Sequence, residues 1–565
     1  MKYGSWKIEG YKREDAVRLC RNGINPLVSV VLASRGVNDP QVYRTLRLES
    51  AQLLHDPYLL KDMDRAAQRV RNAVENKEHI AVYGDYDVDG ITGTCLLTEY
   101  FRSKGLECEI YIPNRLEEGY GVKKHGVERL AKKGVTLIVT VDCGITAVEE
   151  TMCANDLGVD MVITDHHECG EVLPDTAVVN PKRHDCHYPD KMLAGVGVAF
   201  KLICAVEGAE NTEKLLEKYG DLVAVGTIAD VMPVIGENRI LIRRGLELVR
   251  RGVRPGLDKL CQAAGVDKKQ LTVTSVSFTI APRLNAAGRL VKTSVATSLL
   301  LTDDLNKAEE LAHELCALNR RRQELETEMY NSAMSMLKEA PPDGKPIVLA
   351  TSSWHQGVAG IVASKVSEHY RLPAVMVCIQ NGKGRGSCRS YGDFNIYDAL
   401  EASSKWLEGY GGHSMAAGLT VLEENVDKFR ESLGKYYEEK VKEPFESVLD
   451  IDFEVIKPGL LTVENVTALG ELEPYGTGNP KPTLCIKDAE IHMLIPLGGG
   501  RHTKLFIRKW NEFYECICFS RSIEQLGVRT GGTVDVAFVP QINEYRGKRT
   551  VQLLLDDLCT KENAD

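Results

Sequence analysis

Between residues 79 and 180 the chain alternates short apolar runs with amphipathic stretches, and this alternation restricts the fold more than any other feature. The apolar runs have the length and the β-branched content of buried strands, and the stretches between them have helical spacing. Strands that alternate with helices in this way predict a parallel, doubly wound α/β sheet. The predicted strands are 79–83, 108–112, 136–141, 160–164 and 177–180, with helices from Ile91, near 124–133 and near 146–156.

Three aspartates follow the first of these strands. The strand leads into Gly-Asp-Tyr-Asp-Val-Asp-Gly, which contains Asp85, Asp87 and Asp89. Because the aspartates alternate, an extended loop would project their carboxylates the same way, and the carboxylates would repel one another unless a cation lay between them. Mg²⁺ and Mn²⁺ prefer such oxygen ligands. An acidic, solvated turn is the alternative interpretation of this stretch alone.

The ends of later elements carry the same kinds of side chain. These residues are Asp142, Asp165, His166, His167 and Asp230. Each alone has a simpler explanation, such as a turn or a helix cap. Ligands bind at the carboxyl ends of parallel strands, so all of these side chains are expected at one edge of the sheet. Together they suit two divalent cations bridged by carboxylates and a water, the arrangement that promotes phosphoryl transfer.

Length, charge and cysteine content limit the class of protein. A chain of 565 residues is too long for one core and predicts three or four domains. Its net charge of −10 argues against a generic polyanion binder, so any nucleic-acid contact needs local basic patches. The sixteen cysteines form no Cys-x-x-Cys pair, and Cys169, His184, Cys186 and His187 lack the spacing of a structural zinc site. Reduced thiols, and the absence of a signal peptide or membrane span, predict a cytoplasmic protein.

Three further regions follow the first sheet. The stretch from 303 to about 339 lacks proline and glycine and predicts one helix of roughly 50 Å, capped by Thr302 or Asp303, that joins two domains. A second α/β unit, from 346 to about 437, contains glycine-rich segments whose backbone could approach phosphate. From about 447, five short strands predict an OB-like barrel. Its basic and aromatic residues between 501 and 513 suit a single-stranded nucleic acid.

The motifs GDYDVDG, TVDCGIT, DHH and GTIADVMP resemble those of the DHH phosphoesterase superfamily. IPNRLEEGYG, NPKR, LAGVGVAFKL, APRLNAAGRL and LEPYGTGNP extend the resemblance to its RecJ family of single-strand-specific 5′ exonucleases. The resemblance runs from about residue 60 to the end and implies two α/β lobes, DHH and DHHA1, joined by a long helix and followed by an OB-like barrel. The domains implied are an N-terminal helical extension (1–60), the DHH domain (61–300), the helix (301–342), the DHHA1 domain (343–446) and the OB-like domain (447–565).

The resemblance also implies how the acidic residues share two metals, Mn²⁺ or Mg²⁺. One metal would be held by Asp87 or Asp89 together with Asp142, His166 and Asp230, and the other by the remaining aspartates of the first motif. Sister families carry a histidine ligand at the position of Tyr83, so Asp85 either replaces that ligand or supports the others from outside. His167 would lie by the scissile phosphate, with Asp142 and His166 as its catalytic partners.

The same resemblance assigns the substrate-binding residues Arg115, Arg283, Ser387, Arg389 and His413. Arg115, Ser387 and Arg389 would form a pocket for the terminal 5′ phosphate, and Arg283 would guide the strand. For Arg115 the alternative is an ordinary arginine, exposed or paired with Glu117 or Glu118. Relatives usually carry glycine at Cys388, which requires its side chain to point away from the strand.

The function expected from this resemblance is a metal-dependent 5′-to-3′ exonuclease that degrades single-stranded DNA to mononucleotides in DNA repair and recombination. The implied partners are single-stranded DNA, single-strand-binding protein and repair helicases, and the chain is expected to be a monomer. An alternative enzyme would act on short oligoribonucleotides or cyclic dinucleotides, but such small substrates need neither the long helix nor the barrel. A DNA-binding scaffold without activity would have lost aspartates or histidines, and none are lost.

Overall fold

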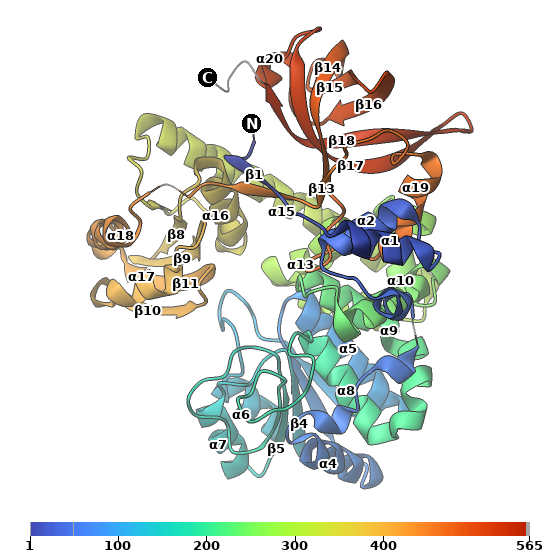
Figure 1. Cartoon of the computed structure of the whole chain (residues 1–565). Helices are drawn as coiled ribbons and strands as arrows, with labels where there is room; N and C mark the ends of the chain where they lie inside the picture. Colours follow the sequence, from blue (N-terminus) through green and yellow to red (C-terminus); the bar gives the residue numbers. More distant parts are fainter. Residues whose placement is uncertain (1, 49, 444, 561–565) are drawn as a thin grey trace. The chain divides into compact units, whose positions relative to one another are not determined.

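The computed structural model describes residues 2–48, 50–443 and 445–560, and these group into two compact units (Figure 1). The two-sheet unit contains the described residues between 50 and 445 together with 476–478. The barrel unit contains residues 2–48, 446–475 and 479–560. No described helix is both long enough and apolar enough to cross a lipid bilayer.

The first sheet of the two-sheet unit is parallel throughout, with the strand order β3-β2-β4-β5-β6. It consists of β2 (Ile80–Gly84), β3 (Cys108–Tyr111), β4 (Leu137–Val141), β5 (Asp160–Thr164) and β6 (Ala177–Val179). Each strand lies within one residue of its predicted range. The prediction of a parallel, doubly wound sheet is confirmed.

Alternate residues of these strands face two different layers of helices. Ile80 and Val82 pack with α4 (Met63–Glu75), α5 (Val88–Ser103) and α8 (Gly195–Glu207). On the opposite face, Ala81 and Ile138 pack with α6 (Lys124–Lys132) and α7 (Val148–Asp156). Both faces of the sheet are therefore covered, as all-parallel sheets require, and ligands bind at the carboxyl ends of the strands.

A helical region links this sheet to the second one. It comprises α9 (Thr212–Ala229), α10 (Gly236–Arg251), α11 (Pro255–Ala263), α12 (Val273–Ser275), α13 (Ala281–Arg289), α14 (Thr293–Leu301) and α15 (Leu305–Glu339). The predicted long helix is present as α15, but its cap is Asp304, one residue after the predicted candidates; the Asp304 carboxylate accepts hydrogen bonds from the amides of Asn306 and Lys307. Leu315 packs in the core of the first sheet and Ala333 in that of the second, so α15 connects two cores.

The second sheet is mixed, with the order β10-β11-β9-β8-β7. Its strands are β7 (Ile347–Thr351), β8 (Ala374–Gln380), β9 (Lys383–Arg389), β10 (Leu407–Gly412) and β11 (Ala416–Leu422), and its helices are α16 (Gln356–Tyr370), α17 (Ile396–Ala402) and α18 (Val426–Lys440). The Cys388 side chain on β9 is fully buried in the core beneath α17 and α18. Because side chains alternate along a strand, Ser387 and Arg389 face the other way.

A closed five-stranded barrel forms the C-terminal part of the barrel unit. Its strands are β14 (Leu484–Leu497), β15 (His502–Lys509), β16 (Glu512–Cys518), β17 (Thr533–Tyr545) and β18 (Lys548–Thr560). Strand β14 pairs with β15 on one side and with β17 on the other, which closes the barrel. The predicted OB-like architecture is confirmed.

The N-terminal segment belongs to the same unit, which the sequence pattern did not indicate. Strand β1 (Ser5–Ile8) pairs in parallel with β12 (Val448–Ile451), and the Asp557 carboxylate on β18 accepts a hydrogen bond from the indole of Trp6 at 3.0 Å. Helices α1 (Arg13–Arg21), α2 (Pro26–Ser34) and α3 (Pro40–Leu46) add Leu27 and Val31 to the barrel core. Residues 2–48 therefore help to complete the barrel core and are more than a leading extension.

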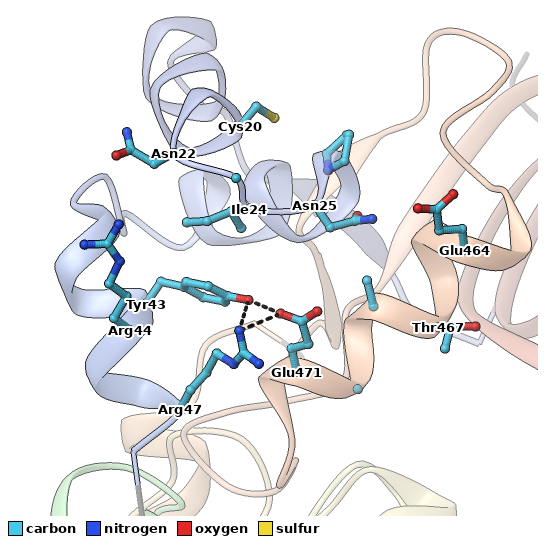
Figure 2. Close-up of a pocket in the computed structure, with 14 residues that line it drawn as sticks. Cys20, Asn22, Ile24, Asn25, Tyr43, Arg44, Arg47, Glu464, Thr467 and Glu471 are labelled. Carbon is cyan, nitrogen blue, oxygen red and sulfur yellow. Dashed lines mark hydrogen bonds and ion pairs between the residues drawn. The ribbon is translucent and has the colours of Figure 1, made fainter.

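A hollow of ≈ 960 Å³ lies in the barrel unit between these N-terminal helices and α19 (Val463–Ala468) (Figure 2). In its wall the Tyr43 hydroxyl donates to Glu471, and Arg47 lies 3.6 Å from the same carboxylate. The other charged lining residues are Arg44 and Glu464. Positive and negative side chains are equal in number, so the hollow favours neither an anionic nor a cationic ligand.

Candidate active site

The aspartates that follow β2 occupy three different kinds of position. Asp85 directly follows the strand, Asp87 is the N-cap of α5, and Asp89 lies in the first turn of that helix. The Asp87 carboxylate accepts a hydrogen bond from the Gly90 amide at 3.1 Å, which starts the helix at Val88. The predicted extended loop and the predicted helix start at Ile91 are therefore wrong, because an aspartate earlier in the chain caps the helix.

Asp89 is anchored by a second helix. Its two carboxylate oxygens accept hydrogen bonds from the backbone amides of Gly195, at 2.6 Å, and Val196, at 2.8 Å. These amides belong to the start of α8, where backbone N–H groups are unpaired and the helix dipole favours negative charge. The position of Asp89 is thus fixed from outside the motif.

Asp142 and the histidines come from the next two strands. Asp142 follows β4 with a φ of 60°, a left-handed conformation that is uncommon for a non-glycine residue and that concentrates at functional sites. Its Oδ1 lies 3.0 Å from Nε2 of His166, which follows β5. Asp165 is fully buried and accepts hydrogen bonds from the amides of Ile145 and His166 and, at 2.8 Å, from Nδ1 of His167.

All the predicted metal ligands lie together at the carboxyl edge of the first sheet. Three groups have ligand atoms within 4.8 Å of one another: Asp89, His166 and Asp230; Asp85, Asp87 and Asp142; and Asp142, His166 and His167. Of the alternatives that the sequence left open, Asp89 is the aspartate grouped with His166 and Asp230, and Asp85 lies in the other group. Asp142 and His166 each belong to two groups, and their 3.0 Å contact joins the group around Asp85 to the group around Asp230.

The charges of this cluster favour a cation. Burial raises the pKa of Asp85 and of Asp142 well above the usual range, and neighbouring carboxylates raise both further. The same two causes raise the pKa of Asp89 to about 7 and that of Asp230 to about 8. Asp85 Oδ1 and Asp230 Oδ2 are buried with no hydrogen-bond partner. Buried oxygens without partners, within a set of repelling carboxylates and imidazoles, fit a hard divalent cation.

The two histidines have opposite protonation properties. Burial, reinforced by the charge of His167, lowers the pKa of His166 to about 3, so its imidazole is neutral and can act as a metal ligand. Burial also opposes protonation of His167, but the hydrogen bond to Asp165 and its charge outweigh that effect and raise the pKa to about 9. His167 is therefore a cation at neutral pH.

Tyr120 joins this site, and the sequence analysis did not assign it. Its hydroxyl oxygen lies 2.9 Å from Nδ1 of His167, and the hydroxyl donates to the Asp142 carbonyl at 3.2 Å. Tyr120 thus connects the residues that follow β4 and β5. Its place in the IPNRLEEGYG motif, shared with Arg115, was the only available signal.

The structure places Arg115 next to the metal ligands. Its guanidinium lies 4.7 Å from the centre of the Tyr86 ring, and its positive charge counteracts the rise in the pKa of Asp85. Glu118, one of the proposed acidic partners of Arg115, instead accepts hydrogen bonds from Tyr111 and from the amide of Asn114. Arg115 is therefore oriented by an aromatic ring.

Ser387 and Arg389 lie near Arg115. The charge of Arg115, after the larger effect of burial, lowers the pKa of the Arg389 guanidinium. From the same strand, β9, Arg385 donates a hydrogen bond to the carbonyl of Leu116, which holds the two segments together. The structure thus brings the three predicted pocket residues into one region.

Two predicted substrate-binding residues are not joined to this region. Arg283 donates to the carbonyl of Thr279 at 2.6 Å, and within the described chain no hydrogen bond or ion pair links it to the acidic cluster. His413 lies in the exposed turn between β10 and β11, where its amide donates to the Ala416 carbonyl at 2.9 Å. Their assignment remains a prediction.

The basic patch of the barrel is more nearly neutral than its sequence indicated. Lys504 pairs with Glu515 at 2.8 Å, and Arg508 pairs with Glu490. Of the aromatic residues, Phe513 is 56% exposed and available for stacking, whereas Trp510 packs against the core. The acidic partners lie on neighbouring strands, so the sequence of one strand does not show that its basic residues are paired.

The comparisons with known proteins agree with this geometry. The DHH family N-terminal domain matches residues 79–227, the DHHA1 domain matches residues 343–439, and the RecJ OB domain matches residues 451–557. A DHH domain with a carboxylate–histidine cluster at its sheet edge, followed by DHHA1, defines the class as a DHH-family protein.

Relatives specify the family. The single-stranded-DNA-specific exonuclease RecJ of Bacillus subtilis (strain 168) is 38% identical over 563 residues, covering 99% of this chain and 71% of the relative. The Escherichia coli (strain K12) protein of the same name is 35% identical over 562 residues, covering 94% and 96%. The crystal structure of RecJ in complex with Mn²⁺ from Thermus thermophilus superposes with a TM-score of 0.85 at 31% identity, covering 98% and 79%. The chain belongs to the RecJ family.

Proposed function

We propose that this chain is a Mn²⁺- or Mg²⁺-dependent exonuclease that degrades single-stranded DNA from the 5′ end to mononucleotides. The observation that carries the proposal is the convergence of overlapping ligand groups at one sheet edge, in a chain related over nearly its whole length to single-stranded-DNA-specific exonucleases. Thermus thermophilus RecJ has been crystallised with both metals, which supports the choice of cations.

The residues of the site have separate tasks in this reaction. When bound, two divalent cations lower the pKa of a water and stabilise charge on the phosphoryl oxygens. Asp85, Asp87 and Asp142 would hold one cation, and Asp89, His166 and Asp230 the other. Nδ1 of His167 faces Asp165, which leaves Nε2 to donate a hydrogen bond to an oxygen of the scissile phosphate. The Tyr120 hydroxyl keeps the His167 ring in place.

Recognition of an end would make this site an exonuclease. A terminal 5′ phosphate carries more negative charge than an internal diester, so guanidinium and hydroxyl donors can select it. Arg115, Ser387 and Arg389 supply such donors, and the effect of Arg115 on the pKa of Asp85 supports a position beside the metal cluster. Arg283 and His413 would contact the strand further from its end.

The proposal extends to the cellular role and the partners. The sixteen cysteines are all free thiols, which suits a reducing cytoplasm. There the enzyme would act as a monomer in DNA repair and recombination, on strands exposed by repair helicases and covered by single-strand-binding protein. The barrel, with the exposed ring of Phe513, would bind the single strand by stacking on its bases.

One substitution tests the chemistry. Asp142→Ala removes a residue common to two ligand groups and should abolish Mn²⁺-dependent degradation of a 5′-labelled single strand, while binding to that strand in EDTA stays unchanged. Unchanged turnover would contradict the metal assignment. A strand blocked at its 5′ end, compared with a 5′-phosphorylated one, tests the polarity, and equal rates would exclude recognition of that end.

A further inference from the structure

Asp230 lies at the end of a helix, and the segment behind it is strained. It is the C-cap of α9, and its Oδ2 lies 3.5 Å from Nε2 of His166. The next residue, Val231, has a φ of 59°. A β-branched residue rarely adopts this left-handed conformation, which is costly and persists only where surrounding contacts enforce it. Residues 231–235, which we call the Asp230 loop, are therefore held in place by their neighbours.

Contacts within the two-sheet unit hold much of the Asp230 loop. The amide of Met232 donates to the Thr227 carbonyl at 3.2 Å, which turns the chain back onto α9. The side-chain amide of Asn238 donates to the Pro233 carbonyl at 3.2 Å. The side chain of Val234 is buried in the core of the first sheet. Each of these contacts comes from residues near the loop in the sequence or from the core beneath it.

A further contact comes from a distant part of the chain. Residues 476–478 belong to the two-sheet unit, although the residues on both sides of them belong to the barrel unit. The Thr477 carbonyl accepts a hydrogen bond from the amide of Val234 at 2.7 Å. Because the amide of a buried residue needs a partner, this bond is part of what keeps the Asp230 loop in its conformation.

Glycine on both sides of Thr477 makes this contact possible. A Cβ at Gly476 would lie 2.6 Å from Cγ2 of Val234, a side chain that is only 2% exposed and has little room to move. Gly478 has a φ of 75°, and a Cβ there would lie 3.3 Å from Cβ of Pro233. Alanine at either position would therefore push residues 476–478 and the Asp230 loop apart. The sequence analysis noted the segment LEPYGTGNP but gave these glycines no task.

The helix side of Asp230 is already fixed. The amide of Asp230 donates to the Gly226 carbonyl at 3.0 Å, and a Cβ at Gly226 would lie 3.1 Å from Oδ1 of Asp89 and 2.7 Å from Cγ1 of Val196. The last turn of α9 thus packs directly on another predicted metal ligand. Since α9 fixes the backbone before Asp230, the Asp230 loop is the remaining determinant of where the carboxylate lies.

We infer that residues 476–478 are a positioning element for Asp230. By holding Val234 they keep the Asp230 loop in its strained conformation, and so set the position from which Asp230 binds a cation. The inference rests on the proposed function for the assignment of Asp230 as a metal ligand. Groups that orient metal ligands from outside typically contribute about 10- to 100-fold to metal affinity, and the segment that leads into the barrel takes this part here.

Binding of Mn²⁺ to the full-length chain tests this role apart from catalysis. Bound Mn²⁺ loses the sharp electron paramagnetic resonance spectrum of the free ion, so a titration gives the number and the affinity of bound ions. Asp230→Asn identifies the ion that Asp230 holds. Gly476→Ala should weaken binding of that ion by about 10- to 100-fold and leave the other at native affinity. Gly470→Ala, in the same lead-in segment but with open space around its Cβ position, is the matched control and should bind Mn²⁺ as the native protein does.

Gly478→Ala provides a second variant in case Gly476→Ala does not fold. Its control is Gly459→Ala, because both glycines have a positive φ, 75° and 82°, but within the described chain a Cβ at Gly459 would have open space around it. Thermal unfolding in EDTA should be the same for each variant and its control. Native Mn²⁺ affinity in the folded variants, or equal weakening of both ions, overturns the inference.

The same titrations separate this inference from the proposed function. If Gly476→Ala weakens only the ion that Asp230 holds, but the native protein degrades no single strand with Mn²⁺, the positioning role stands and the exonuclease proposal fails. If the native protein degrades the strand and both glycine variants bind Mn²⁺ as it does, the inference alone fails. If Asp230→Asn weakens neither ion, the inference fails together with the assignment of Asp230 as a ligand.

Discussion

The metal cluster and the proposed 5′-phosphate pocket of Arg115, Ser387 and Arg389 each concentrate charges of one sign, and they differ in how the chain assembles them. The acids follow adjacent parallel strands or face them from the helices alongside, so one topological rule brings them together. The two arginines come from the loop after β3 and from β9 of the second sheet, and no topological rule predicts that they meet. The acidic site is thus a property of the fold, whereas the basic site depends on individual side-chain contacts.

Removing one acid should have the largest effect. Asp142→Asn keeps the shape of a side chain common to two ligand groups and removes its charge. Loss of even an outer partner of a metal ligand costs about 10- to 100-fold in affinity or activity, so degradation should fall by at least about 1,000-fold. The measurement is the initial rate on a labelled single strand at saturating Mn²⁺.

Asp160→Asn is the matched control for this prediction. Asp160 begins β5, so it lies on the same sheet but at the opposite edge, where it pairs with Arg69 at 2.6 Å. Its loss should leave the rate within about twofold of native, since surface ion pairs contribute about 0–1 kcal/mol. Equal losses in both variants would show that general damage to the sheet, and not metal binding, explains the result.

Metal binding should also stabilise the two-sheet unit. The buried carboxylates repel one another when no cation is present, and a ligand that binds only the folded state adds about 2.7 kcal/mol at a hundredfold excess over its Kd. The melting temperature should therefore rise with Mn²⁺ and return to its original value in EDTA. In Asp142→Asn the rise should be much smaller, and a rise equal to the native one would place the stabilising ion elsewhere.

The sequence predicted the acidic site better than the basic one for physical reasons. Strand periodicity located Asp142 and His166, because apolar runs that end in acids are a local signal. It misplaced the start of α5, since capping by Asp87 competes with an extended loop. Tyr120 could not be found in this way. Its position depends on contacts between segments far apart in the chain, such as the one between its hydroxyl and Nδ1 of His167.

Removing one arginine should have an intermediate effect. Arg389→Gln deletes a charge that has no acidic partner among the described residues, so degradation of a 5′-phosphorylated strand should slow by about 10- to 100-fold, as expected for a hydrogen bond to a charged group. A 5′-hydroxyl strand should be affected less. Lys383→Gln, on the same strand but paired with Glu408, is the control. If degradation of the 5′-phosphorylated strand and of the 5′-hydroxyl strand slows equally, Arg389 supports the fold and does not recognise the phosphate.

The basic residues of the barrel should matter least, because their charges are already partly neutralised. Lys504 pairs with Glu515, so Lys504→Ala should weaken binding to a long single strand by less than about fivefold, the limit set by a surface pair of about 1 kcal/mol. Lys487→Ala, whose lysine pairs with Glu454 outside the patch, is the control. The measurement is affinity at two salt concentrations. A loss of affinity above about tenfold in Lys504→Ala alone would show that the Lys504–Glu515 pair opens and that Lys504 binds phosphate. A lysine with an acidic partner would then contribute to binding as much as Arg389, which has no such partner.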